Sequence, residues 1–328
     1  MFAIDNIYNG ALKASNILVV GDIIYDNYLF GNASRLSPEA PVPIFKPCNE
    51  EFRLGGAANV FSNIISLGAS AQLCGLIGND EEGANIRTRL LSLNNSPDLI
   101  IVSSDRPTTK KTRVLVGNHY LLRIDEETTS EIDEGTENKV FNTINDKIDS
   151  YDLLVVSDYN KGFLKRSFIR KVVDLFIDKK KKIIVDPKSD FYKYSGAFLI
   201  KPNLKELSKL VGEENIYNNY SSLIHHCNTV LTKGNFDYIY VTMGEKGGVL
   251  IGRDGSAQII PAFGGKAVDI TGAGDTTLAA IAVATATNVD IIKAVHFASC
   301  FAGIIVSKAG TATVTKSEVA SFIYDKKI

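Results

Sequence analysis

The sequence predicts an α/β fold: a doubly wound, mostly parallel sheet covered by helices on both faces, with a small β-sheet beside it. Two observations carry this prediction. Short apolar runs typical of buried strands alternate with longer amphipathic segments along most of the chain, which favours parallel strands joined by crossover helices. Two segments outside the alternation, 25–53 and 107–125, combine aromatic and β-branched residues with turn signals, which favours additional antiparallel strands.

The first elements of the chain follow this pattern. Residues 17–20 form an apolar run that ends at Gly21-Asp22, and we interpret it as a buried strand and its carboxyl end. The segment 25–53 carries several prolines, which favours short strands and turns outside the main sheet. A helix is predicted over 55–67, because a glycine pair opens it and Gly68 ends it.

The remaining elements continue the alternation. Strands are predicted over 71–77, 100–103, 153–157, 182–186, 197–200, 238–242 and 248–251. Helices are predicted over 81–93, 133–149, 167–180, 273–287 and 290–308, and another begins at Leu204. Gly117-Asn118 separates two β-rich runs as the turn of a hairpin. We therefore expect one domain over 1–328, in which the segments 25–53 and 107–125 form a small β-lid.

Composition and charge limit the classes of function. The 328 residues include 36 Lys and Arg against 37 Asp and Glu, a net charge of −1, so no overall basic field attracts nucleic acid. An anionic ligand therefore needs local positive charge. The sequence has no run of about 18 apolar residues and no secretory signal at its start, so we expect a cytoplasmic protein without a membrane segment. Its four cysteines form no C-x-x-C pair, which argues against disulfides and a cysteine zinc site.

The strongest chemical signal lies in the segment 269–277, which reads DITGAGDTT and runs into an apolar helix. The small residues Gly272, Ala273 and Gly274 let the backbone approach a ligand closely. The N–H groups at the start of the helix attract anions, including the phosphoryl oxygens of a transition state. Asp275, in the first turn, is a candidate general base for an attacking hydroxyl. The alternative is a carboxylate that only favours the helix dipole or caps the helix.

Four segments together resemble a known family, the ribokinase-like (PfkB) carbohydrate kinases, over nearly the whole chain. In chain order they are 55–59 (GGAAN), 203–206 (NLKE), 242–247 (TMGEKG) and 269–275 (DITGAGD). The resemblance implies a ribokinase-like fold and the transfer of phosphate from ATP to a sugar with Mg²⁺. By the same analogy, a monovalent cation is expected near Asp269, Thr271 and Lys308-Ala309-Gly310.

Further segments resemble one branch of this family, the heptose 7-phosphate kinases. They are 21–28, 34–43 (SRLSPEAPVP), 157–162 (SDYNKG) and 186–188 (DPK). The resemblance implies phosphorylation of O1 of D-glycero-D-manno-heptose 7-phosphate to the 1,7-bisphosphate, in ADP-heptose biosynthesis for lipopolysaccharide core or related surface glycans. It also implies a homodimer. Many relatives carry a fused adenylyltransferase with an H-x-G-H motif, which is absent here, so we expect no such domain and a separate adenylyltransferase in the pathway.

The resemblance assigns roles to the catalytic and phosphate-binding residues. Asp275 would deprotonate the anomeric hydroxyl, and the amides of 272–274 would stabilise the migrating phosphoryl group. Asn203 and Glu206 would organise Mg²⁺, largely through water, and the ATP phosphates, with Lys201 on the same side. The alternative for Asn203 and Glu206 is a capping box at the start of the helix that follows.

The same resemblance places residues around the nucleoside part of ATP. Thr242, Gly244 and Gly247 are expected to border the adenine and ribose. Ala298 and Ala302, on a later helix, would form part of the apolar wall of that site. The alternative for the two alanines is ordinary helix packing.

The residues on the sugar side include an acid, an amide and a glycine pair. Asp22 and Asn59 would bind sugar hydroxyls, because carboxylate and amide groups hydrogen-bond them. Gly55 and Gly56 would let the sugar approach the backbone. The alternatives are that Asp22 forms a turn after its strand and that Asn59 lies on a helix surface.

A substrate that already carries a phosphate needs nearby cations. Lys111, Arg113 and Lys161 lie in segments that match the heptose branch. Arg113 and Lys161 are the best candidates for the 7-phosphate, because Arg offers bidentate geometry and Lys a point charge. The alternative is that these side chains only keep the surface soluble.

Three other functions remain alternatives. The chain could act on another sugar, sugar phosphate or nucleoside within the same family. A nicotinamide-dependent oxidoreductase also uses a doubly wound sheet, but no G-x-G-x-x-G follows the first strand, and no P-loop pattern occurs. A non-catalytic sugar sensor is disfavoured by the intact Asp275 and its glycine-rich segment.

Overall fold

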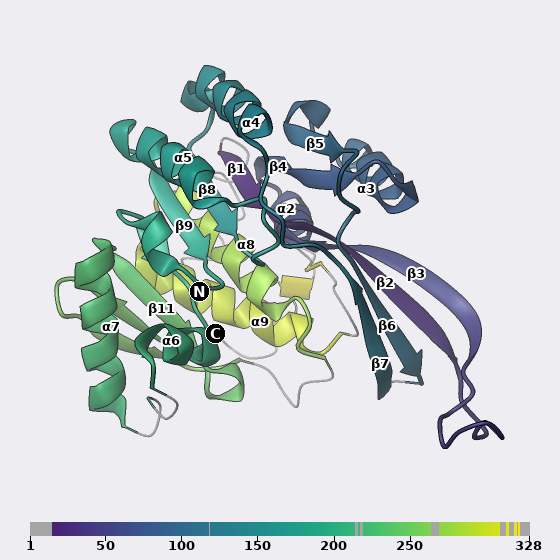
Figure 1. The fold of residues 1–328 in the computed structure, drawn as a ribbon. Coiled ribbons are helices and arrows are strands. Elements are labelled where there is room, and N and C mark those ends of the chain that lie inside the picture. Colours follow the sequence, from purple (N-terminus) through teal and green to yellow (C-terminus); the bar gives the residue numbers. More distant parts are fainter. Residues whose placement is uncertain are drawn as a thin grey trace.

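The computed structural model places the predicted elements around one large sheet (Figure 1). It describes residues 15–117, 119–213, 216, 219–263, 269–308, 313–314, 318–319 and 321. In spatial order, the nine strands that these residues form are β13 (Ala257–Ile260), β12 (Gly248–Gly252), β11 (Tyr238–Thr242), β10 (Leu199–Ile200), β9 (Lys182–Asp186), β8 (Leu153–Ser157), β1 (Asn16–Gly21), β4 (Ser70–Gly78) and β5 (Ile100–Ser103). Pairing is parallel from β11 to β5, and β12 and β13 are antiparallel additions.

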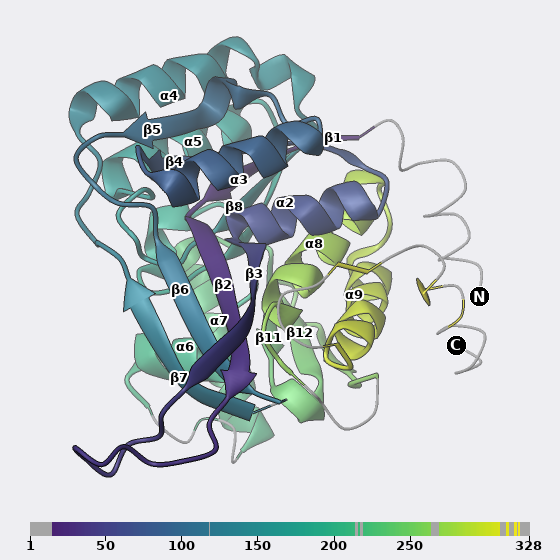
Figure 2. The same ribbon diagram turned by 90° about the vertical axis from the view of Figure 1, so that its right-hand side faces the viewer.

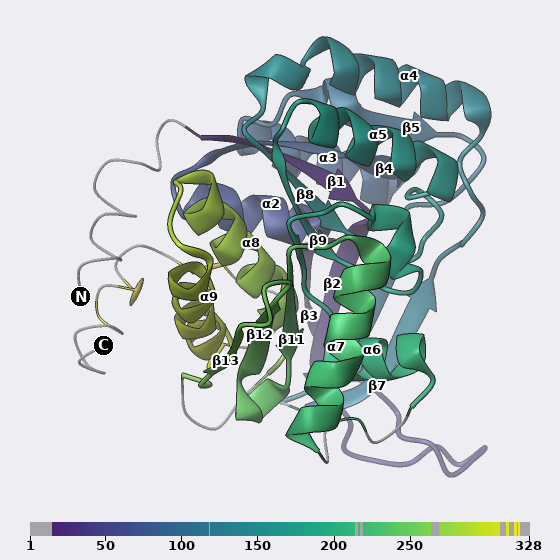
Figure 3. The ribbon, with the colours of Figure 1, turned by 90° about the vertical axis from the view of Figure 1, so that its left-hand side faces the viewer.

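The sheet is covered on both faces because consecutive residues in the middle of its central strands are apolar. In β1, Ile17 and Val19 pack into one core and Leu18 and Val20 into the other. The first core is closed by α2 (Ala57–Ser66), α3 (Glu81–Ser92), α8 (Ala273–Ala286) and α9 (Ile291–Ile305), seen together in Figure 2. The second is closed by α4 (Glu134–Asp146), α5 (Arg166–Asp178), α6 (Leu204–Val211) and α7 (Tyr220–Gly234), of which α5 to α7 lie in front in Figure 3. The predicted doubly wound fold is confirmed.

A second sheet projects from this body (Figure 1). Its order is β3 (Lys46–Gly56), β2 (Ile23–Asn32), β6 (Lys110–Val116) and β7 (His119–Glu126). The prediction of short strands over 25–53 is wrong, because β2 and β3 are long strands paired almost throughout. The prolines that suggested interruptions lie mainly in the connection between them, where Leu36 and Pro43 form an isolated bridge.

Two elements escaped the sequence prediction. Helix α7 has β-branched and polar residues that weaken a helical pattern, and it is held by its ends. The Asn219 side chain caps its start by accepting from Ser221 N, and Asn235 ends it with a φ of 51°. The short edge strand β13 was also not predicted. Within the described residues, none of the helices has the length and apolar character needed to span a bilayer.

Candidate active site

The candidate residues meet at the carboxyl ends of the parallel strands. Gly21 pairs with Ser157, and Ser157 pairs with Asp186, so the residues that follow β1, β8 and β9 lie at one edge of the sheet. Loops at this edge carry the binding sites of doubly wound folds. Asp22 comes directly after β1, and Lys201 directly after β10.

Asp275 lies at the centre of this edge, in the first turn of α8. The helix begins after Gly272, which adopts a φ of 80° that suits glycine. Although Asp275 is a carboxylate, its side chain is almost fully buried. Its Oδ2 accepts a hydrogen bond from Asn59 Nδ2 at 2.8 Å, and its Oδ1 accepts one from the Tyr159 hydroxyl at 2.8 Å.

The surroundings of Asp275 set its protonation. Burial raises the pKa of Asp275 to about 7, because it removes the charged form from water. The hydrogen bonds from Asn59 and Tyr159 oppose this rise, as does the positive charge of Lys201, whereas the negative charge of Asp186 adds to it. The carboxylate can therefore gain or lose a proton near neutral pH, which a general base requires.

The backbone around Asp275 matches the predicted anion site in part. The amide of Ala273 donates to Ile270 O at 3.2 Å, so it already has a partner. The start of α8 supplies further N–H groups without partners inside the helix. A Cβ added to Gly274 would lie 3.7 Å from Lys201 Nζ, so this glycine backbone directly faces a buried ammonium.

The two carboxylate oxygens of Asp22 differ in their hydrogen bonds. Its Oδ2 accepts from the backbone N–H of Tyr159 at 2.8 Å and of Lys161 at 3.2 Å. Its Oδ1 is buried and has no hydrogen-bond partner in the described part of the chain. Burial, with the negative charge of Asp158, raises the pKa of Asp22 to about 6. A sugar hydroxyl would satisfy this buried oxygen.

The glycine pair lies against two carboxyl-bearing residues. A Cβ on Gly55 would come within 2.4 Å of Asp26 Oδ2. Gly56 has a φ of 58°, and a Cβ there would come within 2.4 Å of the carbonyl oxygen of Asp22. Both positions therefore require glycine on steric grounds.

The three predicted phosphate-binding cations fall into two groups. Lys111 and Lys161 meet at Glu127, whose Oε2 is 2.9 Å from Lys111 Nζ and whose Oε1 is 2.5 Å from Lys161 Nζ. Arg113 is buried and pairs with Asp26 at 2.5 Å. Burial argues against a merely solubilising role for Arg113, whereas the role of the partly exposed, ion-paired Lys111 and Lys161 stays a prediction.

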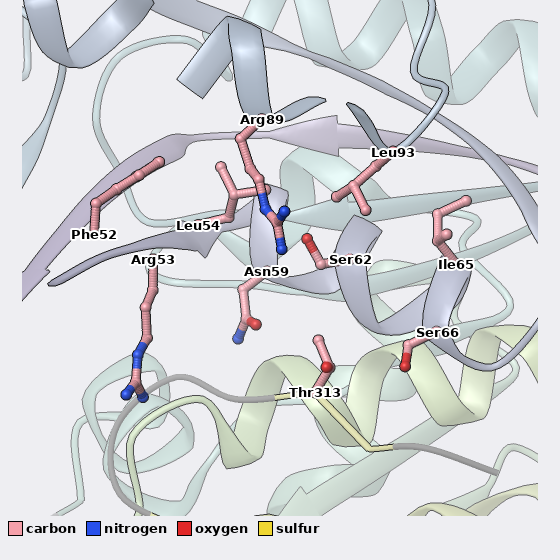
Figure 4. Close-up of a pocket in the computed structure, with 10 residues that line it drawn as sticks. All are labelled: Phe52, Arg53, Leu54, Asn59, Ser62, Ile65, Ser66, Arg89, Leu93 and Thr313. Carbon is pink, nitrogen blue, oxygen red and sulfur yellow. The ribbon is translucent and has the colours of Figure 1, made fainter. Parts of the chain in front are cut away.

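A pocket of about 600 Å³ opens beside β3 and α2. Asn59 lines it, and Arg53 and Arg89 extend toward it from β3 and α3 (Figure 4). Arg53 also stacks on the Tyr28 ring with its Cζ 4.8 Å from the ring centroid. Sequence reasoning missed both arginines, although Arg53 lies two residues before the glycine pair.

The predicted Mg²⁺ residues form the capping box that was the alternative interpretation. Asn203 Oδ1 accepts from Glu206 N, and Glu206 Oε2 accepts from Asn203 N, each at 2.9 Å. Glu206 Oε1 lies 2.9 Å from Lys188 Nζ. An oxygen of Asp186 lies 2.8 Å from Lys201 Nζ. Burial is the main cause that raises the pKa of Asp186, and the negative charge of Glu206 raises it further.

These oxygen donors fit Mg²⁺ held largely through water, because that ion prefers oxygen ligands and keeps several waters. The described residues contain no cluster of three or more His, Cys, Asp or Glu that would hold a metal directly. The expected monovalent cation site is only partly described, since Ala309 and Gly310 lie outside the described residues.

The predicted nucleoside residues are only partly supported. Thr242 ends β11 and donates its N–H to Pro202 O, while Gly244 and Gly247 flank the next turn with φ of 60° and 80°. Ala298 is fully buried in the core, which fits the alternative of ordinary helix packing, and its place beside the nucleoside stays a prediction. Ala302 is partly exposed.

The sequence is similar to a family of carbohydrate kinases and to curated bifunctional proteins. The sequence model of the pfkB family carbohydrate kinases matches residues 14–318. Bifunctional protein HldE of Helicobacter hepaticus is 38% identical over 313 residues, which cover 95% of this chain and 64% of that protein. Bifunctional protein HldE of Sulfurimonas denitrificans is 36% identical over 307 residues, which cover 93% of this chain and 64% of that protein.

Solved structures share the fold at low identity. Phosphofructokinase-2 from Escherichia coli in complex with potassium has a TM-score of 0.77 at 17% identity, covering 96% of this chain and 100% of that one. Ribokinase from Arabidopsis thaliana complexed with ribose and ATP has a TM-score of 0.72 at 17% identity, covering 95% and 99%. The predicted ribokinase-like fold is confirmed.

The chain spans 64% of the length of both curated relatives. The family match supports the predicted ATP-dependent sugar kinase that uses Mg²⁺. Because the family model covers nearly all of the sequence and relatives reach 38% identity, the chain belongs to the pfkB family of carbohydrate kinases.

Proposed function

We propose that this chain transfers the γ-phosphoryl group of ATP to O1 of D-glycero-D-manno-heptose 7-phosphate, giving the 1,7-bisphosphate for ADP-heptose biosynthesis. One observation carries the kinase proposal. A buried carboxylate with a pKa near neutrality, Asp275, lies in the first turn of α8, beside the backbone of Gly274 and the ammonium of Lys201. This arrangement combines a base with a site for phosphoryl oxygens.

The proton and phosphoryl movements balance at these groups. Asp275 takes the proton of the sugar hydroxyl as that oxygen attacks the γ-phosphorus, and ADP leaves. Lys201 and the first-turn amides of α8 stabilise the charge on the equatorial oxygens. Asn203 and Glu206 would hold Mg²⁺ through water, and the ion would neutralise charge on the phosphates of ATP.

The heptose 7-phosphate specificity is supported by the sugar side of the site. Asp22 offers a buried oxygen to a hydroxyl, and Asn59 reaches Asp275 from the same side. Lys111 and Lys161 meet at Glu127, and Lys111 also pairs with Asp125, so the two lysines would bind a sugar phosphate by exchanging these carboxylates for it. The segments 21–28, 34–43, 157–162 and 186–188 resemble the heptose branch.

The small sheet would form a lid over the sugar that accepts the phosphoryl group. Tyr120, in β7, donates its hydroxyl to Asp269 Oδ2 at 2.6 Å, so the sheet contacts the segment that leads into α8. A lid that contacts this segment would exclude water from the transferred phosphoryl group. Homodimer formation, the cytoplasmic location and a separate adenylyltransferase stay predictions.

The test is a substrate panel. ADP release is measured with ATP and D-glycero-D-manno-heptose 7-phosphate, fructose 6-phosphate, ribose or adenosine, and the product is located by ³¹P NMR. We expect turnover of the heptose phosphate and a new phosphorus signal at O1. Turnover of only another acceptor would replace the heptose proposal but keep the kinase, whereas no ADP release with any acceptor would remove both.

A further inference from the structure

Tyr159 touches the candidate base, although nothing in the sequence reasoning gave it a role. Its hydroxyl donates to Asp275 Oδ1 at 2.8 Å across 116 positions of chain. Asn59 holds the other oxygen from α2. The two donors come from different elements, so together they fix the plane of the carboxylate.

The hydroxyl of Tyr159 acts as a donor only. Burial against Asp275, with the nearby charges of Asp186 and Asp26, raises the pKa of Tyr159 well above its ordinary value. The phenol therefore keeps its proton at any working pH and does not compete with Asp275 as a base.

The backbone of Tyr159 is fixed by the candidate sugar ligand. Asp22 Oδ2 accepts from the N–H of Tyr159, while Asp22 Oδ1 is buried without a hydrogen-bond partner in the described residues and is the oxygen that a sugar hydroxyl would satisfy. The same loop is anchored at Asp158, whose Oδ1 accepts from Asn160 N at 2.7 Å and whose Oδ2 lies 2.9 Å from Lys193 Nζ. The carboxylate of Asp22 would thus contact both the sugar and the loop whose Tyr159 hydroxyl binds Asp275.

We propose that Tyr159 is a positioning residue that orients Asp275 and favours its ionised form, and that Asp22 links this orientation to sugar binding. The effect on turnover rests on the proposed function, in which Asp275 is the general base. The groups that face Asp275 are Asn59 from α2, Tyr159 from the loop after β8, Asp186 from β9 and Lys201 after β10. Of these, Asn59 and Tyr159 donate hydrogen bonds to the carboxylate.

The test replaces Tyr159 by Phe, which removes one oxygen. Loss of a donor to a buried anion raises the pKa of that anion, so the acid limb of kcat/KM should move up by about one pH unit. We expect kcat to fall by about 10- to 100-fold, with little change in the KM for ATP. Fluorotyrosine at position 159 is a stronger donor and should move the limb down, which a merely structural role would not do.

A second readout does not depend on turnover. The pKa of the Asp275 carboxyl is followed by ¹³C NMR in the free protein, with its signal assigned by its loss in Asp275→Asn. Tyr151→Phe is the matched control, because it removes another tyrosine hydroxyl. Tyr151 lies just before β8, at the opposite end of the strand from Tyr159, and its hydroxyl donates to Gln72 in β4. An Asp275 pKa that is the same in Tyr159→Phe and wild type would overturn the proposal. Absence of kinase activity in wild type would instead count against the proposed function.

Discussion

The side chains of Asn59 and Asp275, 216 positions apart, meet through a hydrogen bond of 2.8 Å. Asn59 belongs to α2, which the glycine pair begins, and Asp275 belongs to the first turn of α8. The bond joins the sugar side of the site to the phosphoryl-transfer side. It also means that a change at the base will be felt at the acceptor-binding helix.

Asp275→Asn should lower phosphoryl transfer by about 10²- to 10⁴-fold, because the amide cannot accept the hydroxyl proton. Nucleotide affinity should stay close to that of wild type, since Asp275 lies on the acceptor side of the transferred group. ADP release measures the first effect, and calorimetric titration with ATP measures the second. Turnover near the wild-type rate would rule out Asp275 as the base.

The pH dependence of kcat/KM for the sugar should show an acid limb near pH 7. Asp275 must be ionised to accept a proton, and burial raises its pKa to about 7. Activity is therefore present above this pKa and lost, tenfold per pH unit, as the pH falls below it. Rates at saturating ATP between pH 5 and 9 measure the limb, with Asp275→Asn as the control without it. A limb below pH 5 would contradict the assignment.

The elements that could be predicted from the sequence are those whose buried residues form a clear apolar pattern. Strands over 100–103, 153–157, 182–186 and 238–242 have the predicted bounds, because each is a short apolar run bounded by polar or turn residues. Helix α7 was missed because its stability comes from caps and packing rather than from its residue types. Ala298 is fully buried, and a family resemblance alone does not tell whether an alanine on a helix packs in the core or lines a pocket.

The same limit applies to the candidate site. The family resemblance named Asn59 and Asp275, which hydrogen-bond to each other, and Asp22, which accepts from the N–H of Tyr159 beside them. The partner of Tyr159 could not be predicted, because its hydroxyl contact depends on the loop path after β8. Likewise, the ion pair of Arg113 with Asp26 follows from strand register, in which β2 lies beside β6.

Asp22→Asn should weaken sugar binding without affecting ATP. The amide oxygen can still accept from Tyr159 N, but the group facing the sugar becomes a donor or loses its charge. Loss of a hydrogen bond to a charged group is worth about 1.5 to 3 kcal/mol, or roughly 10- to 150-fold in kcat/KM for the sugar. Titration with ATP is the control. An unchanged KM for the sugar would remove Asp22 from the acceptor site.

Lys161→Met should raise the KM for a phosphorylated sugar by about 10- to 100-fold, because a charge-assisted bond to phosphate is lost. The KM for ATP should not change. Lys179→Met is the matched control: that lysine also pairs with a carboxylate, Asp149 at 2.9 Å, but at the end of α5. Equal KM values for the two variants would exclude Lys161 from phosphate binding.

Gly56→Ala should destabilise the protein more than Gly117→Ala. Both glycines have a positive φ, 58° and 59°, but Gly56 also has a ψ of −135°, which lies outside the left-handed helical region and which glycine adopts far more readily than alanine, so alanine is strained there by its backbone as well as by contacts. At Gly117 a Cβ meets nothing within 4 Å, whereas at Gly56 it would come within 2.4 Å of the carbonyl oxygen of Asp22. Urea unfolding should show an additional loss of about 1 to 3 kcal/mol for Gly56→Ala. Because the clash displaces Asp22, the KM for the sugar should rise in this variant alone, and equal stabilities would show that the β3–α2 junction relaxes without cost.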